Sequence, residues 1–514
     1  MLSDITFQEH FHRLQEKVLA KRPVLRQILA KHGGKSLLEY ANEYVDVNLS
    51  PPIMQLQSEL LSTIHEATRE RFGEQTANDL VVQMEKYYFV STADHLGPIT
   101  HPFFVNSNLL TAVAMHTHSE PTLKFVPVLA CANVSLNNSS FPRGLLFNSY
   151  KDNPEQAIHM HRLSFLPSNA HSHSAYNFRA YTKDEVVKVE KRIQELLKEG
   201  NVTPQIAQKV AGIVNDIYNK PDILACTNFR DQIGRTNRDL WKRFFASSGT
   251  HLPDLIYLDQ EDIVVRLLTK YHLNCDTVIN HIIFDPTYEQ YIDKYFEGIF
   301  GSFSKKDKVG TYLFWALPKG AKLNMQLWKE GNYLVSNDGS YRIELHPEKI
   351  RDAMLAGELI PSLLLNFMTI CLYYGLKCLG GFSQVNYLTE MKNAYIKMNT
   401  DLANYRSIEV CARAQTREIC CGLTLAFLGY DGGRVAMASG MDLILYEDAD
   451  SWKKLMDLSK KMTIEEALNP LMPEMYRVSY DEKEWEPELL ISEQEINQQT
   501  GLDKKVAPCV TIKN

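Results

Sequence analysis

Apolar residues recur every three or four positions through the first part of the chain, which is the spacing of one face of an α-helix. The repeat stops at Gly33-Gly34 and resumes after Pro51-Pro52, a pair suited to the first turn of a helix. The pattern predicts a helical N-terminal region over residues 1–86. Its first repeat consists of Phe7, Phe11, Leu14 and Val18.

Between residues 87 and 181 the pattern changes to short apolar runs separated by Asn, Ser, Gly, Pro and His. Tyr88-Phe89-Val90 and residues 125–129 are two of these runs. Runs of this length are typical of buried strands. The stretch therefore predicts a mixed α/β segment with His-rich loops.

Residues 182–303 are predicted to be mainly helical. Thr182 and Glu185 form a capping-box pattern, and the apolar positions that follow keep helical spacing as far as Gly200. A second helix is expected to begin at Pro204, because proline suits the first position of a helix.

The C-terminal part of the chain mixes both patterns. Alternating apolar residues at 323–327 and 341–345 flank Asn337-Asp338-Gly339, which predicts an antiparallel meander within an α+β region over residues 304–475. Residues 476–514 are expected to form a peripheral extension or tail. The predicted fold class is α/β or α+β, helix-rich, with a mixed sheet core, a helical N-terminal layer and the meander in the C-terminal half.

The most apolar stretch runs from residue 359 to residue 379. Its length raises the question of a membrane span, but Pro361, Asn366 and Lys377 interrupt it. We expect a buried core helix here and no membrane partner.

Composition narrows the class of protein. The 55 Lys and Arg residues face 62 Asp and Glu residues, so the net charge of −7 provides no bulk attraction for nucleic acid. The nine cysteines are scattered without a CxxC pair, and the N-terminus lacks an export signal pattern, so a reduced, cytoplasmic protein is expected. The expected partner is a small-molecule substrate, and the oligomeric state stays open.

Histidines are concentrated in the mixed segment. Six of them form three His-x-His pairs, and residues two apart on a strand project to the same face, so a pair can give two imidazoles to one metal. The pair His171 and His173 is the preferred metal candidate, and the alternative is a polar surface loop. The eight histidines are His95, His101, His116, His118, His159, His161, His171 and His173.

Asp94 and His95 lie where an apolar strand ends in the turn Leu96-Gly97-Pro98. Catalytic groups commonly occupy such strand ends. Metal ligation or acid–base work by Asp94 and His95 is one interpretation, and hydrogen bonding to the turn backbone is the other.

Two further stretches are candidates for substrate binding. The loop at 133–144 contains Asn138 and Arg143, and either orients a polar substrate or is held by its own Asx turns. Arg230, Arg235 and Arg238 fall within nine residues, and either clamp an anion or pair with nearby carboxylates. No nucleotide-cofactor motif is present: Gly33-Gly34-Lys35-Ser36 lacks the earlier glycine of a phosphate loop.

Residues 89–147 resemble part of the creatininase-type amidohydrolases. In that family a strand runs into a Glu-x-His-Gly-Pro-like turn, and residues 94–98 (Asp-His-Leu-Gly-Pro) are similar. A second similarity ends at Phe141-Pro142-Arg143-Gly144. The resemblance implies a metal-dependent amidohydrolase in which Asp94 and His95 map as ligands. Asn137-Asn138 stands where the family has Glu-His, so the complete two-metal set is not carried over.

The leading hypothesis is an enzyme that hydrolyses a small polar amide or another C–N bond. In it Asp94, His95, His171 and His173 hold a divalent Zn, Mn or Fe ion that activates water, while an arginine binds an anionic group. One alternative is a metal-free transferase or lyase using histidine acid–base chemistry, whose activity survives chelation. The other is a non-enzymatic interaction protein, which predicts no deep polar pocket around residues 94–173.

Overall fold

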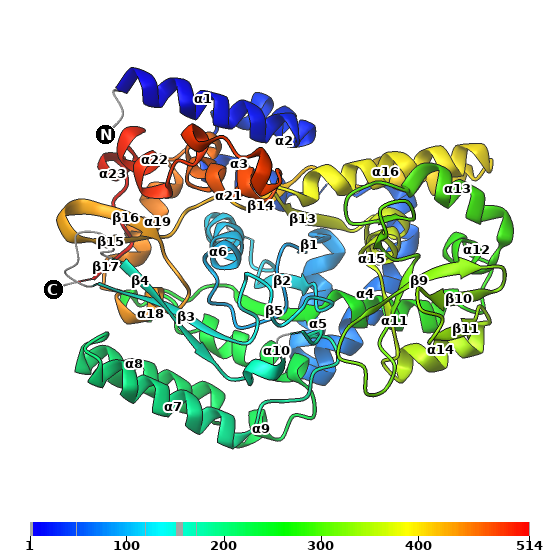
Figure 1. Ribbon diagram of the computed structural model, residues 1–514, viewed down its shortest axis with the longest axis horizontal. Coiled ribbons are helices and arrows are strands. Elements are labelled where there is room, and N and C mark those ends of the chain that lie inside the picture. The colour runs from blue at the N-terminus through cyan, green and yellow to red at the C-terminus, as the bar shows by residue number, and fades with distance from the viewer. Residues whose placement is uncertain (1–3, 48, 119, 151–157, 171, 513–514) are drawn as a thin grey trace.

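A five-stranded parallel sheet lies at the centre of the protein (Figure 1). The computed structural model describes residues 4–47, 49–118, 120–150, 158–170 and 172–512. The strand order is β14-β13-β1-β2-β5, and every neighbouring pair is parallel. The strands are β1 (Phe89–Ser91), β2 (Phe125–Ala130), β5 (Asp254–Asp259), β13 (Lys377–Gly381) and β14 (Ile419–Cys421).

The first strand in sequence, β1, is the middle strand of this sheet. The chain adds β2 and β5 on one side of β1 and later returns to add β13 and β14 on the other side. A sheet wound in this way has a crevice at its carboxyl edge where the order reverses, since the loops after the two central strands leave toward opposite faces. Here the reversal lies between β1 and β13.

Both faces of the central sheet are buried, as parallel sheets require. Val126, Val128 and Leu255 belong to the hydrophobic core on one face, whereas the alternate residues Leu129 and Ile256 belong to the core on the other. This alternation explains why β2 is a continuous apolar run with all six residues buried.

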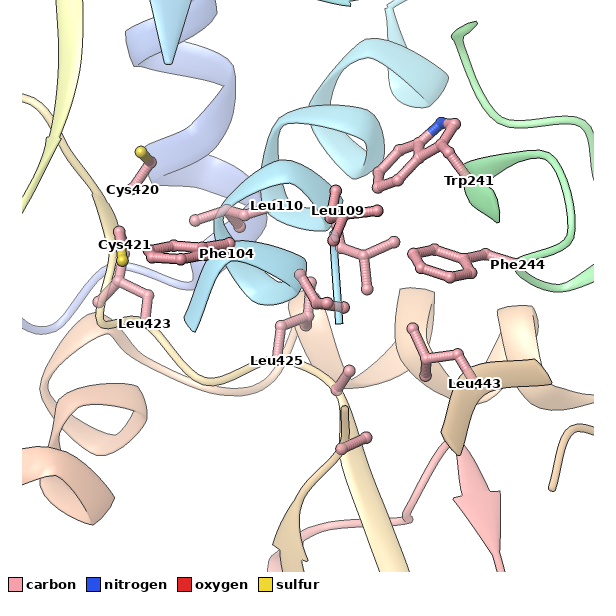
Figure 2. Packing of buried hydrophobic residues seen from close by; sticks show 14 of the residues in the cluster. Phe104, Leu109, Leu110, Trp241, Phe244, Cys420, Cys421, Leu423, Leu425 and Leu443 are labelled. Carbon is pink, nitrogen blue, oxygen red and sulfur yellow. The ribbon is translucent and has the colours of Figure 1, made fainter. Parts of the chain in front are cut away.

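Helix α6 (Pro102–Thr117) is the centre of the first core, and 13 of its 16 residues are buried. Leu109 and Leu110 lie among apolar side chains that include Trp241, Phe244 and Leu425 (Figure 2). A helix that is apolar on all sides is stable only inside a protein. Other helices of this core include α3 (Leu37–Val45), α7 (Lys183–Lys198), α8 (Pro204–Ile213) and α10 (Phe229–Trp241).

The second core packs helices and the antiparallel meander against the opposite face. Its helices include α4 (Pro51–Phe72), α5 (Glu74–Lys86), α11 (Gln260–Leu267), α12 (Val278–Phe284), α13 (Pro286–Phe296), α15 (Leu363–Phe367) and α16 (Gln384–Asp401). The meander, in strand order, is β11 (Arg342–Glu344), β10 (Tyr333–Ser336), β9 (Met325–Glu330), β8 (Phe314–Ala316) and β12 (Leu359–Pro361).

The remaining elements complete these two layers and contribute residues to the same cores. Small sheets are formed by β3 (Gly144–Tyr150) with β4 (Ile158–Ser164), by β6 (Phe303–Ser304) with β7 (Val309–Gly310), and by β16 (Arg434–Met437), β15 (Phe427–Tyr430) and β17 (Val510–Thr511). The other helices are α1 (Asp4–Ala20), α2 (Pro23–His32), α9 (Pro221–Leu224), α14 (Pro347–Leu355), α17 (Tyr405–Arg413), α18 (Asp442–Leu445), α19 (Ser451–Ser459), α20 (Ile464–Leu468), α21 (Met472–Arg477), α22 (Glu493–Gln499) and α23 (Leu502–Lys505).

The helix-rich α/β class, the helical N-terminal layer and the meander are confirmed. The capping box at Thr182 and Glu185 begins α7, as its pattern predicts. The region predicted as a peripheral extension contributes β17, which pairs with β15, and buries Ile496 and Leu502.

Two predicted elements are wrong. Residues 359–379 are buried but do not form one helix: Pro361 ends β12, and a short helix and a π-helical turn lead into β13. Leu323, expected on a strand face, is 60% exposed and precedes β9. Among the described helices, none combines the length and the apolar character needed to cross a membrane.

Truncating the centre of the first core should destabilise the protein strongly. Leu109 is fully buried, so Leu109→Ala leaves a cavity and should lower the free energy of unfolding by roughly 2–5 kcal/mol in urea titrations. Val187, on α7, is 51% exposed, and Val187→Ala should change the free energy of unfolding by less than about 1 kcal/mol. Equal effects of the two variants would contradict the central position of α6.

Candidate functional site

A cavity of about 840 Å³ lies at the carboxyl edge of the central sheet, and we call it the switch-point cavity. Residues that follow the strands line it, with His95 after β1, Cys131 after β2 and Ser383 after β13. Ligands of doubly wound sheets bind at this position, because the loops that diverge there leave an open crevice. The cavity therefore occupies the place where this topology favours binding.

The other walls of the switch-point cavity come from distant parts of the chain. Phe103 and Phe104 start α6, Gln384 starts α16, and Arg22 joins α1 to α2. Ser479, shortly after α21, closes the C-terminal side. The walls thus combine aromatic rings with uncharged polar groups and a few charged ones, a composition typical of small-molecule sites.

Hydrogen bonds define the tautomer of His95. Asn138 Oδ1 accepts hydrogen bonds from the backbone N–H and the hydroxyl of Ser140, at 3.0 and 2.8 Å, so this atom is the amide oxygen. Nδ1 of His95 lies 3.1 Å from the same oxygen and must donate to it. Burial lowers the pKa of His95, which favours the neutral ring with Nε2 unprotonated.

His101 has the opposite tautomer. It is the N-cap residue of α6, and its Nδ1 accepts a hydrogen bond from the backbone N–H of Phe103 at 3.3 Å. Burial, together with the nearby His95 and Arg162, lowers the pKa of His101 to about 3. The neutral ring therefore carries its proton on Nε2, and the cavity is lined by one imidazole that can accept a proton and one that can donate a hydrogen bond.

Asp94 does not line the switch-point cavity, although it adjoins His95. Its carboxylate is fully buried and accepts a hydrogen bond from Asn108 of α6 at 2.9 Å. Burial raises the pKa of Asp94 to about 7. The carboxyl group therefore links the segment after β1 to α6. The hydrogen bond it accepts comes from Asn108, and not from the turn backbone.

The metal ligands expected from the sequence are not gathered at one place in the described part of the chain. His173 lines a separate cavity with Tyr176 and Arg230, and His171 lies outside the described residues. No group of three or more His, Cys, Asp or Glu side chains among the described residues is arranged to hold a metal. The described donors do not fit the expected set, and a bound metal stays a prediction.

Asn138 and Arg143, expected together in one substrate loop, have different surroundings. Asn138 lines the switch-point cavity and forms the Asx turn with Ser140, so both interpretations of its loop apply to it. Arg143 does not line this cavity. Its guanidinium lies 5.0 Å from the centre of the Phe141 ring, and burial lowers its pKa.

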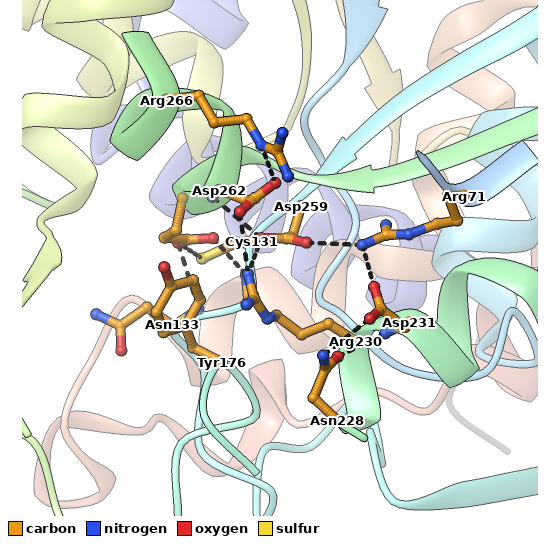
Figure 3. A network of polar contacts seen from close by, with 12 residues as sticks. Arg71, Cys131, Asn133, Tyr176, Asn228, Arg230, Asp231, Asp259, Asp262 and Arg266 are labelled. Carbon is orange, nitrogen blue, oxygen red and sulfur yellow. Dashed lines mark hydrogen bonds and ion pairs between the residues drawn. The ribbon is translucent and has the colours of Figure 1, made fainter. Parts of the chain in front are cut away.

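The arginines of α10 mainly pair with carboxylates of the protein itself. Arg230 donates to Asp259 at 2.9 Å and stacks on Tyr176 (Figure 3). Arg238 donates to Asp254 at 2.7 Å. Arg235 has no ion pair with a described residue and lines a cavity of about 220 Å³ beside α4. None of the three lines the switch-point cavity, so no shared clamp is formed there.

This ion-pair network fixes the end of β5 and the start of α11 (Figure 3). Arg71 of α4 donates to Asp231 at 2.9 Å and pairs with Asp259 at 3.5 Å. Arg230 and Arg71 hold the pKa of Asp259 below its ordinary value in spite of burial. The network joins α4, α10 and β5, and Asp259 directly precedes Gln260, which lines the switch-point cavity.

The cavity thiols are not activated. The carboxylate of the buried Glu261 accepts from the backbone N–H of Ala132 at 2.8 Å and from the Cys131 thiol at 3.5 Å. Burial and this carboxylate raise the pKa of Cys131, and burial raises the pKa of Cys421. Both remain protonated at neutral pH, so neither is an effective nucleophile.

Sequence reasoning did not single out His101 or Arg22 as site residues. Each stands directly before a proline that begins a helix, which is a signal for a helix cap. The signal indicates that both residues precede a helix, but it does not indicate that they line the same cavity.

The fold and the site define a helix-rich α/β protein with a doubly wound parallel sheet and, at its switch point, a cavity lined by aromatic and polar residues. No protein-family model matches the chain, and no curated protein matches it in sequence. The function is therefore argued from the cavity itself.

The two cavity histidines should differ in tautomer. In ¹⁵N-detected histidine spectra near neutral pH, we expect His95 to be protonated at Nδ1 and His101 at Nε2, each assigned by its loss in His95→Gln or His101→Gln. The same tautomer at both rings would contradict the hydrogen bonding described above.

The buried Asp94 should make stability depend on pH. Its folded-state pKa of about 7 exceeds the ordinary value of 3.8, so the folded state binds the proton more tightly and the free energy of unfolding falls as pH rises between these values. When the pH rises from 5 to 8, the free energy of unfolding should fall in both proteins. In urea titrations, we expect this fall to be roughly 2 kcal/mol smaller in Asp94→Asn than in the wild type. Asp184→Asn, at an exposed position of α7, is the control, and an unchanged pH dependence in Asp94→Asn would contradict the expectation.

Proposed function

We propose that this protein is an enzyme that performs acid–base chemistry on a small polar metabolite in the switch-point cavity, with His95 Nε2 as the proton-accepting atom. The observation that supports this proposal most is the His95–Asn138 hydrogen bond, which leaves Nε2 unprotonated. Among the described residues, no side chain or backbone group makes a hydrogen bond to Nε2. A neutral imidazole held by its second nitrogen is suited to general-base catalysis.

The surrounding groups complete this mechanism. His95 removes a proton from the substrate or from water, and Asn138 Oδ1 stabilises the imidazolium that forms, through the Nδ1–H it already accepts. The Nε2–H of His101 donates a hydrogen bond to an oxygen on which negative charge develops. The Phe104 ring packs edge-on against His95 at 5.4 Å between ring centres and limits its rotation.

Small amides and related C–N compounds are the first substrate class to examine. Asn138, Gln260 and Gln384 give the cavity both amide donors and amide acceptors, which complement a carboxamide. The resemblance to amidohydrolases points to the same class. Of its two mapped residues only His95 lines the cavity, so the chemistry proposed here is carried by the histidines.

A cavity with several polar side chains in this position also favours an enzyme over an interaction protein. The interaction hypothesis predicts no deep polar pocket around residues 94–173. The switch-point cavity is lined by His95, His101, Cys131 and Asn138, all within that range.

The proposal is tested by incubating the purified protein with a metabolite extract and following consumed compounds by mass spectrometry. We expect the wild type to consume a small polar compound in the presence of EDTA, and His95→Gln to reduce the rate by about 100-fold or more. His159→Gln, at an exposed histidine of β4, should act like the wild type. An unimpaired His95→Gln variant would exclude His95 as the base, and loss of activity with EDTA would favour the metal hypothesis.

The pH dependence of the identified reaction gives a second test. Because burial lowers the pKa of His95 and only the neutral ring accepts a proton, the acid limb of kcat/KM should lie below the ordinary histidine value of 6.5. A limb above that value would assign the base to another group.

A further inference from the structure

Arg22 is an unusual buried cation in the wall of the switch-point cavity. The residue is only 6% exposed and joins α1 to α2. Its guanidinium lies over the Phe382 ring at 5.3 Å, and Nη1 donates to the hydroxyl of Ser479. Its Nε is buried and makes no hydrogen bond with any described residue. Part of the donor set of this guanidinium is therefore unused.

No carboxylate of the described residues balances this charge. The cavity is also lined by Glu390 and Glu474, but both are exposed, and no carboxylate contributes to the pKa shift of Arg22. Burial lowers the pKa of Arg22 to about 10, which still leaves it protonated at neutral pH. A buried charge without a partner is strongly unfavourable, because desolvation is not offset by an ion pair.

Two partly buried arginines elsewhere in the protein are arranged differently. Arg71 and Arg230 have side chains that are 9% and 18% exposed, and each is paired with the buried Asp259 (Figure 3). Burial lowers the pKa of Arg230, but the Asp259 carboxylate more than offsets this, so the pKa is raised. The fold thus supplies a carboxylate at Arg71 and Arg230, whereas none of the described residues supplies one at Arg22.

The surroundings of Arg22 favour a singly charged anion. Burial lowers the pKa of both His95 and His101, which favours their neutral forms, and the one other cation that lines the cavity in the described part of the chain, Lys21, is exposed. The first backbone N–H groups of α2, at Val24 and Leu25, already donate to Asn386 Oδ1. Arg22 is therefore the buried cation among the described residues that line the cavity, and the planar donor set of a guanidinium matches a carboxylate.

We propose that Arg22 binds a carboxylate of the substrate, so that the enzyme acts on a small monocarboxylate whose reacting group reaches His95. The inference rests on the switch-point cavity being the active site proposed above. Phe382, Tyr387 and Phe104 also line the cavity, and their aromatic rings suit a substrate with an apolar part.

The test measures binding separately from turnover. Each probe is a small carboxylate paired with its uncharged amide: acetate with acetamide, and 3-phenylpropanoate with 3-phenylpropanamide, followed by calorimetry and by the shift of the unfolding temperature. We expect the wild type to bind each carboxylate about tenfold or more tightly than its amide. The preference should fall to about twofold or less in Arg22→Met, and Arg22→Lys should retain part of it.

Two controls make the result specific. Arg192→Gln, at an exposed arginine of α7, should keep the full carboxylate preference. Without any probe, Arg22→Met should unfold at the same temperature as the wild type or higher, because it removes a buried charge that no described carboxylate balances. A clearly lower unfolding temperature of Arg22→Met would assign Arg22 a structural role and overturn the proposal.

Other outcomes also decide the question. Equal binding of carboxylates and amides by the wild type, an undiminished preference in Arg22→Met, or tighter binding of phenyl phosphate than of 3-phenylpropanoate would each overturn the carboxylate assignment. His95→Gln should bind the carboxylates like the wild type. If carboxylate binding depends on Arg22 but turnover does not depend on His95, this inference is retained and the proposed chemistry is rejected. If turnover depends on His95 but binding does not depend on Arg22, the chemistry is retained and this inference is rejected.

Discussion

The parallel pairing of β1 with both β2 and β13 is the constraint on which the rest of the structure depends. Parallel neighbours cannot be joined by a tight turn, so the chain must cross over a face of the sheet between them. The crossover after β1 is α6, which belongs to the first core, whereas α16 after β13 packs mainly in the second. Since both faces are covered, the carboxyl edge is where loops diverge and leave a cavity.

Buried charged side chains near this cavity occur in two arrangements. At the end of β5, Asp259 pairs with Arg71 and Arg230, so a buried carboxylate and two arginines balance one another. In the wall, Arg22 has no carboxylate partner among the described residues. The first arrangement makes the site rigid. In the second arrangement, the proposal made above is that the Arg22 guanidinium binds a carboxylate of the substrate.

Elements with strong local signals were predicted correctly, but the sequence did not indicate which elements pack against them. The apolar spacing of α1 and the capping box of α7 act within one or two helical turns, so they are readable from sequence. Residues 359–379 show the limit: their hydrophobicity predicts burial, but helix and strand cannot be told apart in a buried apolar run. Pairing of β13 with β1 and β14 makes its part of this run a strand.

At the site, the sequence by itself determined that polar, catalytically capable groups follow the apolar strands β1 and β2, because strand ends and turns have recognisable residue patterns. It also identified His95 and Asn138, although not their contact. Tertiary structure alone decided that Asp94 lies in the core while its neighbour His95 lines the cavity, that His173 and Arg230 line a different cavity, and that Arg22 and His101 face the same one. The physical reason is that side-chain direction and long-range proximity depend on how strands and helices pack, and packing joins residues hundreds of positions apart.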